Sequence, residues 1–500
     1  MKLFKLIITL VVLHFAISVK AQNEQDVLRY SFTNAIGSAR SMACGNAFGA
    51  LGADYSSLVT NPAGLARYRS SEMGITANFF NVKTNSFYIN NTQTDNKFNL
   101  NINNAGLAVA VPTGNSTGWR YVNLGFGTNR IANFNKSIYF EGINNKSSIV
   151  QHFEQSANGT DTSNLGSTSG SFLAWYQYLI NNESGSANQY YSDFTNDSSY
   201  SLRQRISIEQ GGGMSDISLA ISGNYDDKVY IGGSLNFYKV KFTEANTFIE
   251  EVLSHSVAGY QKLSYLNNLN TSGSGVGAKI GVIALPTKYL RLGLAFHTPS
   301  RIYLTDNYNS TLSSTINNIS NSKSSPDGTY DYSITIPGKI AASAAFLYDK
   351  RGFISVDFEH VDYRDGKLNS GTDNISALDT FTLGVNNKVR SLYRAANNIR
   401  IGAEYTFDEV YCARAGVGFT GSPYNTEVSG PSKFKTSIPF ISCGFGIRNG
   451  NYFLDAALVK NFATNYYAPY TLNPSGQAKY YTSETQSVAT NFTVTIGLKF

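Results

Sequence analysis

Short runs of alternating apolar and polar residues, joined in pairs by very short connectors, constrain this chain most. In the run 290–298, apolar residues alternate with small or charged ones: Leu290, Leu292, Leu294 and Phe296 against Arg291, Gly293, Ala295 and His297. A period of two residues is typical of a β-strand with one apolar side. Because the opposite side carries charges in mid-strand, the apolar side is expected to face lipid and the other a polar lumen. The pattern therefore predicts a transmembrane β-barrel.

Counting such runs gives fourteen strands, and single-chain bacterial barrels have an even number. The expected strands are 72–81, 98–111, 119–130, 214–225, 228–241, 274–285, 289–300, 338–348, 351–363, 397–407, 410–421, 436–448, 451–462 and 488–500. Tight connectors rich in turn residues, such as Asp226-Asp227, alternate with connectors that are long and rich in Asn, Ser and Gly. Since short turns lie on the periplasmic side of such barrels, both termini are expected there.

The first residues predict export. Lys2 and Lys5 precede an apolar stretch, Leu6 to Val19, which ends in a small-residue cleavage site at Ala21. The apolar stretch is shorter than the roughly 20 residues of a membrane-spanning helix, which disfavours an N-terminal anchor. We expect residues 1–21 to be a cleaved signal peptide and the protein to lie in the bacterial outer membrane.

Composition supports a barrel and argues against a nucleic-acid partner. The 33 Tyr and 31 Phe suit the two aromatic girdles of a barrel. The formal charge of +6 falls to +3 once Lys2, Lys5 and Lys20 are removed with the signal peptide. No linker divides the chain after about residue 71, so residues 71–500 are expected to form one barrel with long extracellular loops.

Neither a cofactor nor a metal site is expected. The five histidines lie far apart, without a close pair or a cysteine partner. Alternation places Cys412 on the lumen face and Cys443 on the lipid face, so a disulfide between them is not expected.

Residues 22–70 do not alternate and are dense in small residues. Small side chains allow close packing in a confined space, so this segment is predicted to be a partly helical hatch inside the lumen. The alternative is a periplasmic extension. The apolar character of the segment, and the turn expected at Asn61-Pro62 just before the first strand, favour the hatch.

This segment resembles the FadL/OmpP1/TodX family of outer-membrane transporters of long-chain fatty acids and other hydrophobic compounds, in its Bacteroidetes-like branch. The resemblance rests on the stretch from Arg40 to Phe48, on Asp54, and above all on the hatch motif Asn61, Pro62, Ala63 and Gly64. It implies a hatch-plugged barrel of fourteen strands that captures an apolar ligand at an extracellular groove, holds it in a lumen pocket, and releases it laterally beside a kinked third strand. The expected partners are a hydrophobic small molecule or fatty acid.

The longest connector contains an apolar run, 171–180, that is too short to span a bilayer. Exposed apolar patches usually mark binding surfaces. The run therefore predicts an outer groove formed by Phe172, Leu173, Trp175, Tyr176 and Leu179. A helix that packs against its own loop, with Ile149, Val150 and Phe153, is the alternative.

Alternation also places charged residues in the lumen, where a cation beside an apolar pocket would orient a carboxylate. Arg291 and Arg400 are the predicted carboxylate ligands. The alternative is that such cations pair with Asp357, Glu359, Glu404 or the hatch. In the third strand, Gly125 and Gly127 predict either a bend at a lateral gap or space for the hatch.

The residues also bear on other classes of function. No local motif brings together a nucleophile and a base, so an enzyme is not expected. A porin-like barrel, or a surface-binding adhesin or haem-binding barrel, remains the alternative function. Further expected partners are outer-membrane lipids and the barrel-assembly machinery, which would bind the last strand ending in Phe500. A barrel closed by one chain needs no second copy, so a monomer is expected.

Overall fold

The computed structural model describes residues 23–32, 37–194, 200–254, 257–349, 351–370, 380–425, 437–472 and 481–500. The predicted signal peptide, 1–21, lies outside the described residues. Among the described helices, none is both long enough and apolar enough to cross a membrane.

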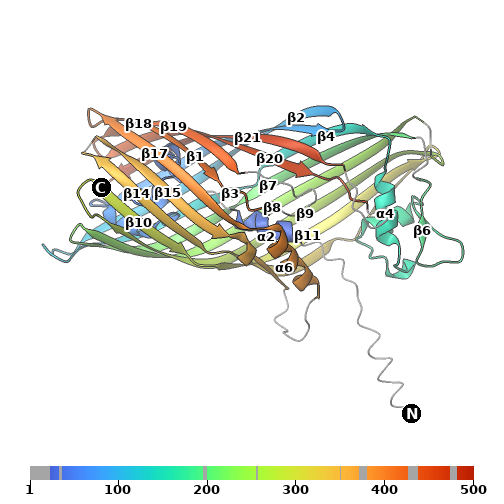
Figure 1. Ribbon diagram of the computed structural model, residues 1–500, viewed down its shortest axis with the longest axis horizontal. Coiled ribbons are helices and arrows are strands. Elements are labelled where there is room, and N and C mark those ends of the chain that lie inside the picture. The colour runs from blue at the N-terminus through green and yellow to red at the C-terminus, as the bar shows by residue number, and fades with distance from the viewer. Residues whose placement is uncertain are drawn as a thin grey trace, which may run out of the picture.

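Antiparallel strands form one closed sheet (Figure 1). Its nineteen segments are β1 (Glu72–Tyr88), β2 (Asn91–Pro112), β3 (Trp119–Asn133), β4 (Lys136–Asn144), β7 (Ser201–Tyr225), β8 (Val229–Ser254), β9 (Tyr260–Ala284), β10 (Leu290–His297), β11 (Ser300–Ile316), β12 (Ile319–Ser324), β13 (Gly328–Ile336), β14 (Lys339–Tyr348), β15 (Gly352–Asp362), β16 (Lys367–Ser370), β17 (Ala395–Phe407), β18 (Tyr411–Thr420), β19 (Ile438–Asn449), β20 (Tyr452–Tyr467) and β21 (Ser483–Lys499).

Pairing of β1 with β21 closes the sheet into a barrel. Five of the nineteen segments are parts of longer strands: β4 continues β3, β11 continues β10, β12 and β13 run into β14, and β16 continues β15. The barrel therefore has fourteen strands. Ser71 and Phe500 exchange two backbone hydrogen bonds at the closure, with N to O distances of 3.0 and 2.9 Å. The predicted fold class is confirmed.

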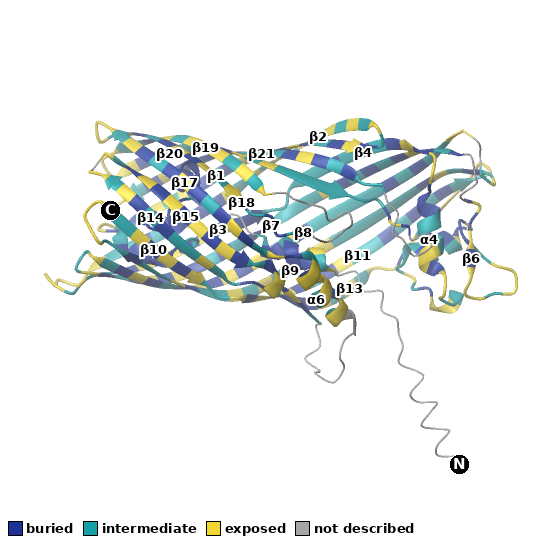
Figure 2. Cartoon of the chain, in the orientation of Figure 1, coloured by how far each residue is buried: buried dark blue, intermediate teal, exposed yellow. Residues whose placement is uncertain are grey.

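The two faces of the barrel have the predicted polarity. On the last strand, Phe492 and Ile496 are exposed on the outside, whereas Thr493 and Thr495 are buried towards the lumen. Figure 2 shows this alternation of exposed and buried residues along most strands in the periplasmic half. Cys412 is buried and Cys443 is exposed, as their predicted faces require. The alternating sequence suits a strand here because its apolar side chains face lipid on the outside and its small or polar side chains face the hatch on the inside.

Strand ends at the short turns match the sequence prediction to within about two residues. Asp226, Asp227, Asp408 and Glu409 adopt positive φ at these turns, between 50° and 61°. Asp tolerates this left-handed conformation better than most residues, which explains its use there. By the general rule for outer-membrane barrels, this end is periplasmic.

At the other end, the predicted strands are too short. β8 runs to Ser254 and β9 starts at Tyr260, although 242–273 reads as a long loop. β1 and β2 likewise continue to a tight turn at Ile89-Asn90. Outside the membrane a strand needs no apolar face, so its Asn, Ser and Thr residues carry no alternation signal.

Short helices and small strands complete the described fold. In the hatch they are α3 (Ala39–Ala43), η2 (Tyr55–Leu58) and η3 (Pro62–Arg67), preceded by α2 (Glu24–Ser31). Between β4 and β7 lie α4 (Ile149–Ala157), η4 (Thr162–Asn164), α5 (Gly170–Tyr176), β5 (Asn181–Asn182) and β6 (Tyr190–Tyr191), which cap the extracellular end; η5 (Tyr363–Asp365) and α6 (Thr380–Leu392) flank β16 (Figure 1).

Candidate functional site: the plugged lumen

Residues 37–70, the part of the hatch described after the gap at 33–36, fill the periplasmic half of the lumen. Backbone groups of the hatch bond to side chains of the wall: Ala39 N donates to Thr495 Oγ1 at 2.7 Å and Gly49 N to Asp357 Oδ2 at 2.9 Å. Ser355 Oγ donates to Ala47 O at 2.6 Å. The wall therefore satisfies the irregular hatch backbone, which a buried loop could not leave unpaired.

The hatch motif joins the hatch to two strands. Asn61 caps η3, since its Oδ1 accepts from Ala63 N at 3.1 Å, and its Nδ2 donates to Gly49 O at 2.8 Å. The same nitrogen lies 3.3 Å from Val282 O on β9 and 3.4 Å from Leu294 O on β10. Pro62 occupies the first helical position, where its missing N–H costs nothing.

Gly64 completes the motif because the hatch folds tightly onto itself there. A Cβ at Gly64 would lie 2.4 Å from Ser57 Oγ and 3.0 Å from the Cα of Gly52. The wall opposite is equally tight: a Cβ at Gly402 would lie 2.2 Å from Cys44 O. Small lumen-facing residues, noted in the sequence, are thus the wall's side of the hatch interface.

A chain of buried charges fixes the hatch to strands β17, β18 and β20. Arg40 donates to both carboxylate oxygens of Glu404, from Nη2 at 2.7 Å and from Nε at 2.9 Å. Arg414 bridges the same Glu404, at 2.5 Å, and Asp455, at 2.7 Å. Each buried charge therefore has an opposite charge beside it, as burial demands.

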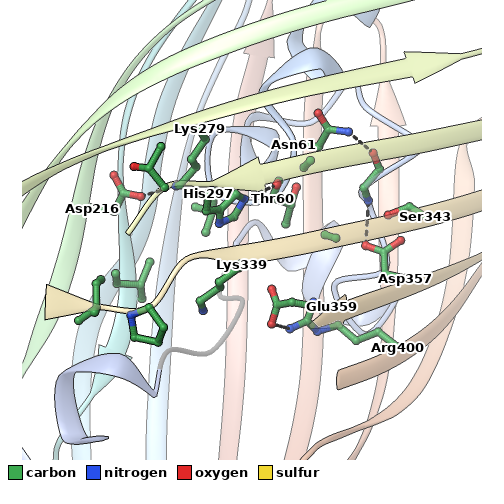
Figure 3. Close-up of a pocket in the computed structure, with 18 of the residues that line it drawn as sticks. Thr60, Asn61, Asp216, Lys279, His297, Lys339, Ser343, Asp357, Glu359 and Arg400 are labelled. Atoms are coloured by element: carbon green, nitrogen blue, oxygen red, sulfur yellow. Dashed lines mark hydrogen bonds and ion pairs between the residues drawn. The ribbon is translucent and has the colours of Figure 1, made fainter. Parts of the chain in front are cut away.

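Polar and charged residues line a narrow cavity between the hatch and the wall (Figure 3). Thr60 and Asn61 contribute from the hatch, and Lys279, Lys339 and Glu359 from the strands. Its volume is about 60 Å³, far below the roughly 300–1,000 Å³ of ligand pockets. The cavity suits a few water molecules and is too small to hold a long apolar ligand.

The two predicted carboxylate ligands have different surroundings. Arg400 forms an ion pair with Glu359, with Nη2 and Oε1 3.2 Å apart. Its charge is therefore already neutralised, as the alternative interpretation stated, and the structure does not support Arg400 as a carboxylate ligand. Arg291 instead donates from Nη1 to the backbone oxygen of Leu51 at 2.8 Å, and no described carboxylate forms an ion pair with it.

Arg67 shares this environment, although the sequence analysis did not single it out. The aliphatic part of the Arg67 side chain lies against Gly52, since a Cβ added at Gly52 would be 2.7 Å from Arg67 Cγ. Arg291 donates to the carbonyl of the preceding residue, Leu51. Arg67 donates to Tyr230 Oη at 2.5 Å and pairs with no described carboxylate. The Nε atoms of both arginines are buried without a partner in the described chain. Only the tertiary fold brings the two charges together.

Above the hatch, α2 fills an apolar chamber. Val27 and Tyr30 are buried among apolar and aromatic side chains of the wall and of α6: Ile131, Met214, Tyr238, Val240, Phe242, Ile302, Leu304, Tyr332, Ile334, Tyr363, Val385 and Val389. The Arg29 guanidinium carbon lies 4.2 Å from the centre of the Phe242 ring. Side chains of α2 thus cover this apolar part of the inner wall.

The predicted outer groove residues are split between the interior and the surface of the cap. Leu173 is fully buried and Leu179 nearly so, in one cluster with Ile149, Val150 and Phe153. Phe172 and Trp175 are partly buried, with ring centres 6.2 Å apart, and Tyr176 is exposed. The helix α5 therefore packs against α4 within its own loop, as the alternative interpretation states. Phe172, Trp175 and Tyr176 form an aromatic edge that faces outwards.

One buried carboxylate fastens this cap to the barrel. Glu250 accepts hydrogen bonds from Ser148 Oγ at the start of α4, from Gln204 Nε2 at 2.8 Å and from Tyr260 Oη at 3.1 Å. It lies far beyond the 9–11 residues with which a strand crosses the membrane. Burial raises the pKa of Glu250 above its ordinary value, despite these donors.

Gly125 and Gly127 lie in an unbroken part of the wall. Gly125 pairs with Ala108 on one side and Ala220 on the other. Leu58 and Leu65 of the hatch fill the space that side chains there would occupy. These glycines therefore accommodate the hatch, and the wall is not open at their position.

The ladder between the second and third strands ends further out. Its last pair is Asn104 with Asn129, and beyond it β2 pairs only with β1 while β4 pairs with β7. β2 and β4 are linked there by side chains, as in the bond from Asn91 Nδ2 to Glu141 O at 3.1 Å. This seam, between residues 91–103 and 130–144, is a break in main-chain pairing of the wall.

Comparisons with known proteins agree on the fold. The structure resembles a Pseudomonas aeruginosa FadL homologue with a TM-score of 0.59 at 13% identity, covering 94% of this chain and 100% of that one. The Ralstonia pickettii toluene transporter TbuX gives a TM-score of 0.51 at 13% identity, covering 93% and 99%. The Pseudomonas putida toluene transporter TodX gives 0.50 at 12%, covering 94% and 100%.

Sequence comparison shows the family. None of the curated proteins matches the chain. The family model described as "Outer membrane protein transport protein (OMPP1/FadL/TodX)" matches residues 213–500, which is more than half of the chain. The chain therefore belongs to the OMPP1/FadL/TodX family of outer-membrane transport proteins, whose members carry hydrophobic compounds across the outer membrane.

Proposed function

We propose that this protein takes up hydrophobic compounds that carry a carboxylate, such as long-chain fatty acids, by passive transport. The observation that carries the proposal is the pair Arg67 and Arg291, two partly buried guanidinium groups beside the Leu51-Gly52 peptide with no described carboxylate partner. Two adjacent like charges of this kind repel each other unless an anion lies near them. A carboxylate would receive charge-assisted hydrogen bonds from both.

Capture is assigned to the cap. The aromatic edge of Phe172, Trp175 and Tyr176 is the part of α5 that a ligand can reach without unfolding the cap. Leu173 and Leu179 would support this edge from beneath. From there an apolar chain would enter the chamber that α2 occupies, whose aromatic and aliphatic lining matches such a chain.

Passage requires the hatch to move, because the polar cavity beside it is too small for a ligand. The motif residues Asn61, Pro62, Ala63 and Gly64 would act as the anchor about which the rest of the hatch shifts, since Asn61 is bonded to both β9 and β10. Lateral release would use the seam beyond Asn104 and Asn129, where no ladder has to be broken. Since Asn129 is ten residues beyond Trp119, the first residue of β3, this exit would open at the outer edge of the membrane.

A neutral ligand is the second candidate, since two structurally similar proteins are described as toluene transporters. Oleate and oleyl alcohol separate the two functions because they differ only in the head group. The mature chain in proteoliposomes is expected to take up oleate faster than oleyl alcohol, and Arg67→Ala/Arg291→Ala should remove that preference. Arg364→Ala, in an exposed pair with Asp362, is the matched control.

Equal uptake of oleate and oleyl alcohol by the unaltered protein would contradict the carboxylate assignment and leave a neutral hydrophobic substrate. Rapid flux of sugars through the unaltered protein would contradict transport through a plugged barrel altogether and favour a porin. Uptake of neither lipid, with toluene transported, would assign the protein to aromatic hydrocarbons.

A further inference from the structure

On the outer face of the barrel, cationic residues lie just beyond the apolar belt, on its extracellular side. Along β8, Ile231, Leu235 and Phe237 point outwards and are exposed, and the next two outward positions are Lys239 and Lys241. On the seventh strand, Arg301 of β11 follows the outward apolar residues of β10 in the same way. Lys239, Lys241 and Arg301 are all exposed.

Strand register gathers these three cations around β9. Lys239 pairs with Ser274, and Lys241 pairs with Ser272. On the other side of β9, Tyr303 pairs with Ser274 and Arg301 with Val276. Because neighbouring strands lie about 4.8 Å apart, the lysines of β8 and Arg301 of β11 lie on either side of β9, about 10 Å apart across the sheet. Arg301 stands beside Val276, one outward position nearer the apolar belt than Ser274. We define Lys239, Lys241, Arg301, Ser272 and Ser274 as the cationic patch.

No ion pair among the described residues balances the charges of the patch, although exposed Asp331 lies in the same row across the strands as Lys241 and Ser272. None of the three cations forms an ion pair with a carboxylate of the described chain; Arg301 donates from Nε to Ser333 Oγ at 2.9 Å and lies 5.1 Å from the Tyr303 ring centre. Two more exposed outward lysines without an ion pair to a described residue, Lys83 on β1 and Lys460 on β20, lie at similar distances from the periplasmic turns.

The periplasmic rim differs. There Asp227 pairs with both Arg69 and Arg120, so the signs are mixed. A strand crosses a bilayer in about 9–11 residues, and Lys239 is ten residues beyond Val229, the first residue of β8. The patch therefore lies at the level of the head groups of the outer leaflet.

We propose that the cationic patch binds the phosphate of an outer-leaflet lipid. The two lysines and Arg301 supply charge-assisted hydrogen bonds, and the two serine hydroxyls lie between them as further donors. Directly below, Val276, Ile280 and Leu235 offer exposed apolar surface on which the acyl chains of the same lipid would lie. The head group and chain contacts together select an anionic lipid over a free anion.

Native mass spectrometry of the folded mature chain tests this, with diphosphorylated lipid A and the same lipid without phosphates as probes. Lys239→Gln/Lys241→Gln/Arg301→Gln is expected to lower retention of the phosphorylated lipid roughly tenfold or more. The control, Lys228→Gln/Lys288→Gln/Arg351→Gln, removes three exposed periplasmic cations and should retain it as the unaltered protein does. Migration on gels with and without heating shows that each barrel is folded.

Three results would overturn the proposal. The first is equal retention of the phosphorylated lipid by the patch variant and the control variant. The second is equal retention of the phosphorylated and dephosphorylated lipids by the unaltered protein. The third is complete displacement of the lipid by inorganic phosphate at the same concentration, which would assign the patch to free anions.

Discussion

Arg40 of the hatch and Glu404 of β17 form a two-pronged ion pair, with nitrogen to oxygen distances of 2.7 and 2.9 Å. It is a charge-assisted, two-bond link between plug and wall. Glu404 also forms an ion pair with Arg414, so this carboxylate pairs with two cations, whereas Arg40 pairs with one carboxylate. The two partners are therefore not equivalent, and their replacement should not have equal effects.

Glu404→Gln is expected to loosen the hatch more than Arg40→Ala. Removing the shared carboxylate leaves buried positive charge uncompensated, which costs about 3–5 kcal/mol, whereas Arg40→Ala leaves Glu404 paired with Arg414 and costs about 1–3 kcal/mol. Ion conductance through single molecules in planar bilayers measures this. Larger or more frequent openings with Arg40→Ala than with Glu404→Gln would refute the ranking.

Gly402→Val should displace the hatch from the wall. Its side chain would meet the Cys44 carbonyl, which lies 2.2 Å from an added Cβ, and overpacking of this kind costs about 1–3 kcal/mol. Thermal unfolding followed by gel mobility should show a less stable barrel. Gly384→Val is the control, because an added Cβ there meets no atom within 4 Å. Equal melting temperatures for the two variants would show that the contact is not tight.

Leu173→Ala and Trp175→Ser should separate the stability of the cap from its binding. Leu173 is fully buried, and truncation of such a leucine costs about 2–5 kcal/mol, so the segment between β4 and β7 should become sensitive to protease. Trp175 is at the partly exposed edge, and its replacement should lower oleate uptake with little change in protease resistance. Unchanged uptake by Trp175→Ser in a correctly inserted barrel would remove this edge from the capture site.

The attachment of the cap should depend on pH. Because burial raises the pKa of Glu250, the folded cap binds the proton more tightly than the unfolded cap does. Its stability is therefore highest below the ordinary glutamate value, 4.5, and falls as the pH rises through the raised value. Protease resistance of α4 across this range measures it. Glu250→Gln cannot ionise and should flatten the profile; a profile of the same slope in that variant would assign the dependence to other groups.

Much of the barrel is predictable from the sequence because lipid imposes a strict alternation on each crossing. Runs such as 290–296 and 488–500 indicate that a strand is present, which of its faces is apolar, and where along the chain it crosses the membrane. The extracellular continuations of β8 and β9 do not, because water accepts polar residues on both faces. Their Asn and Thr residues therefore resemble a loop until pairing is seen.

The site is less predictable, because charge pairing depends on which strands become neighbours. Arg291 and Arg400 look alike in sequence, yet Glu359 lies beside Arg400 while Leu51 carbonyl and Arg67 lie beside Arg291. Arg67 follows the hatch motif by only three residues, but nothing local distinguishes it from a solvated arginine. The hatch motif is recognisable by its resemblance to the family, and the residues themselves predict only the turn at Asn61-Pro62. The tight packing at Gly64 becomes visible only in the structure.

The length of β8 bears on where a hydrophobic molecule first meets this protein. Its 26 residues extend about 85 Å, while the apolar band of such barrels is about 25 Å tall. Even with the usual tilt, the wall rises tens of ångströms above the lipid head groups, through the saccharide layer that repels greasy molecules. The capped extracellular end of the barrel therefore stands well above the membrane, and a hydrophobic molecule would first meet the protein there.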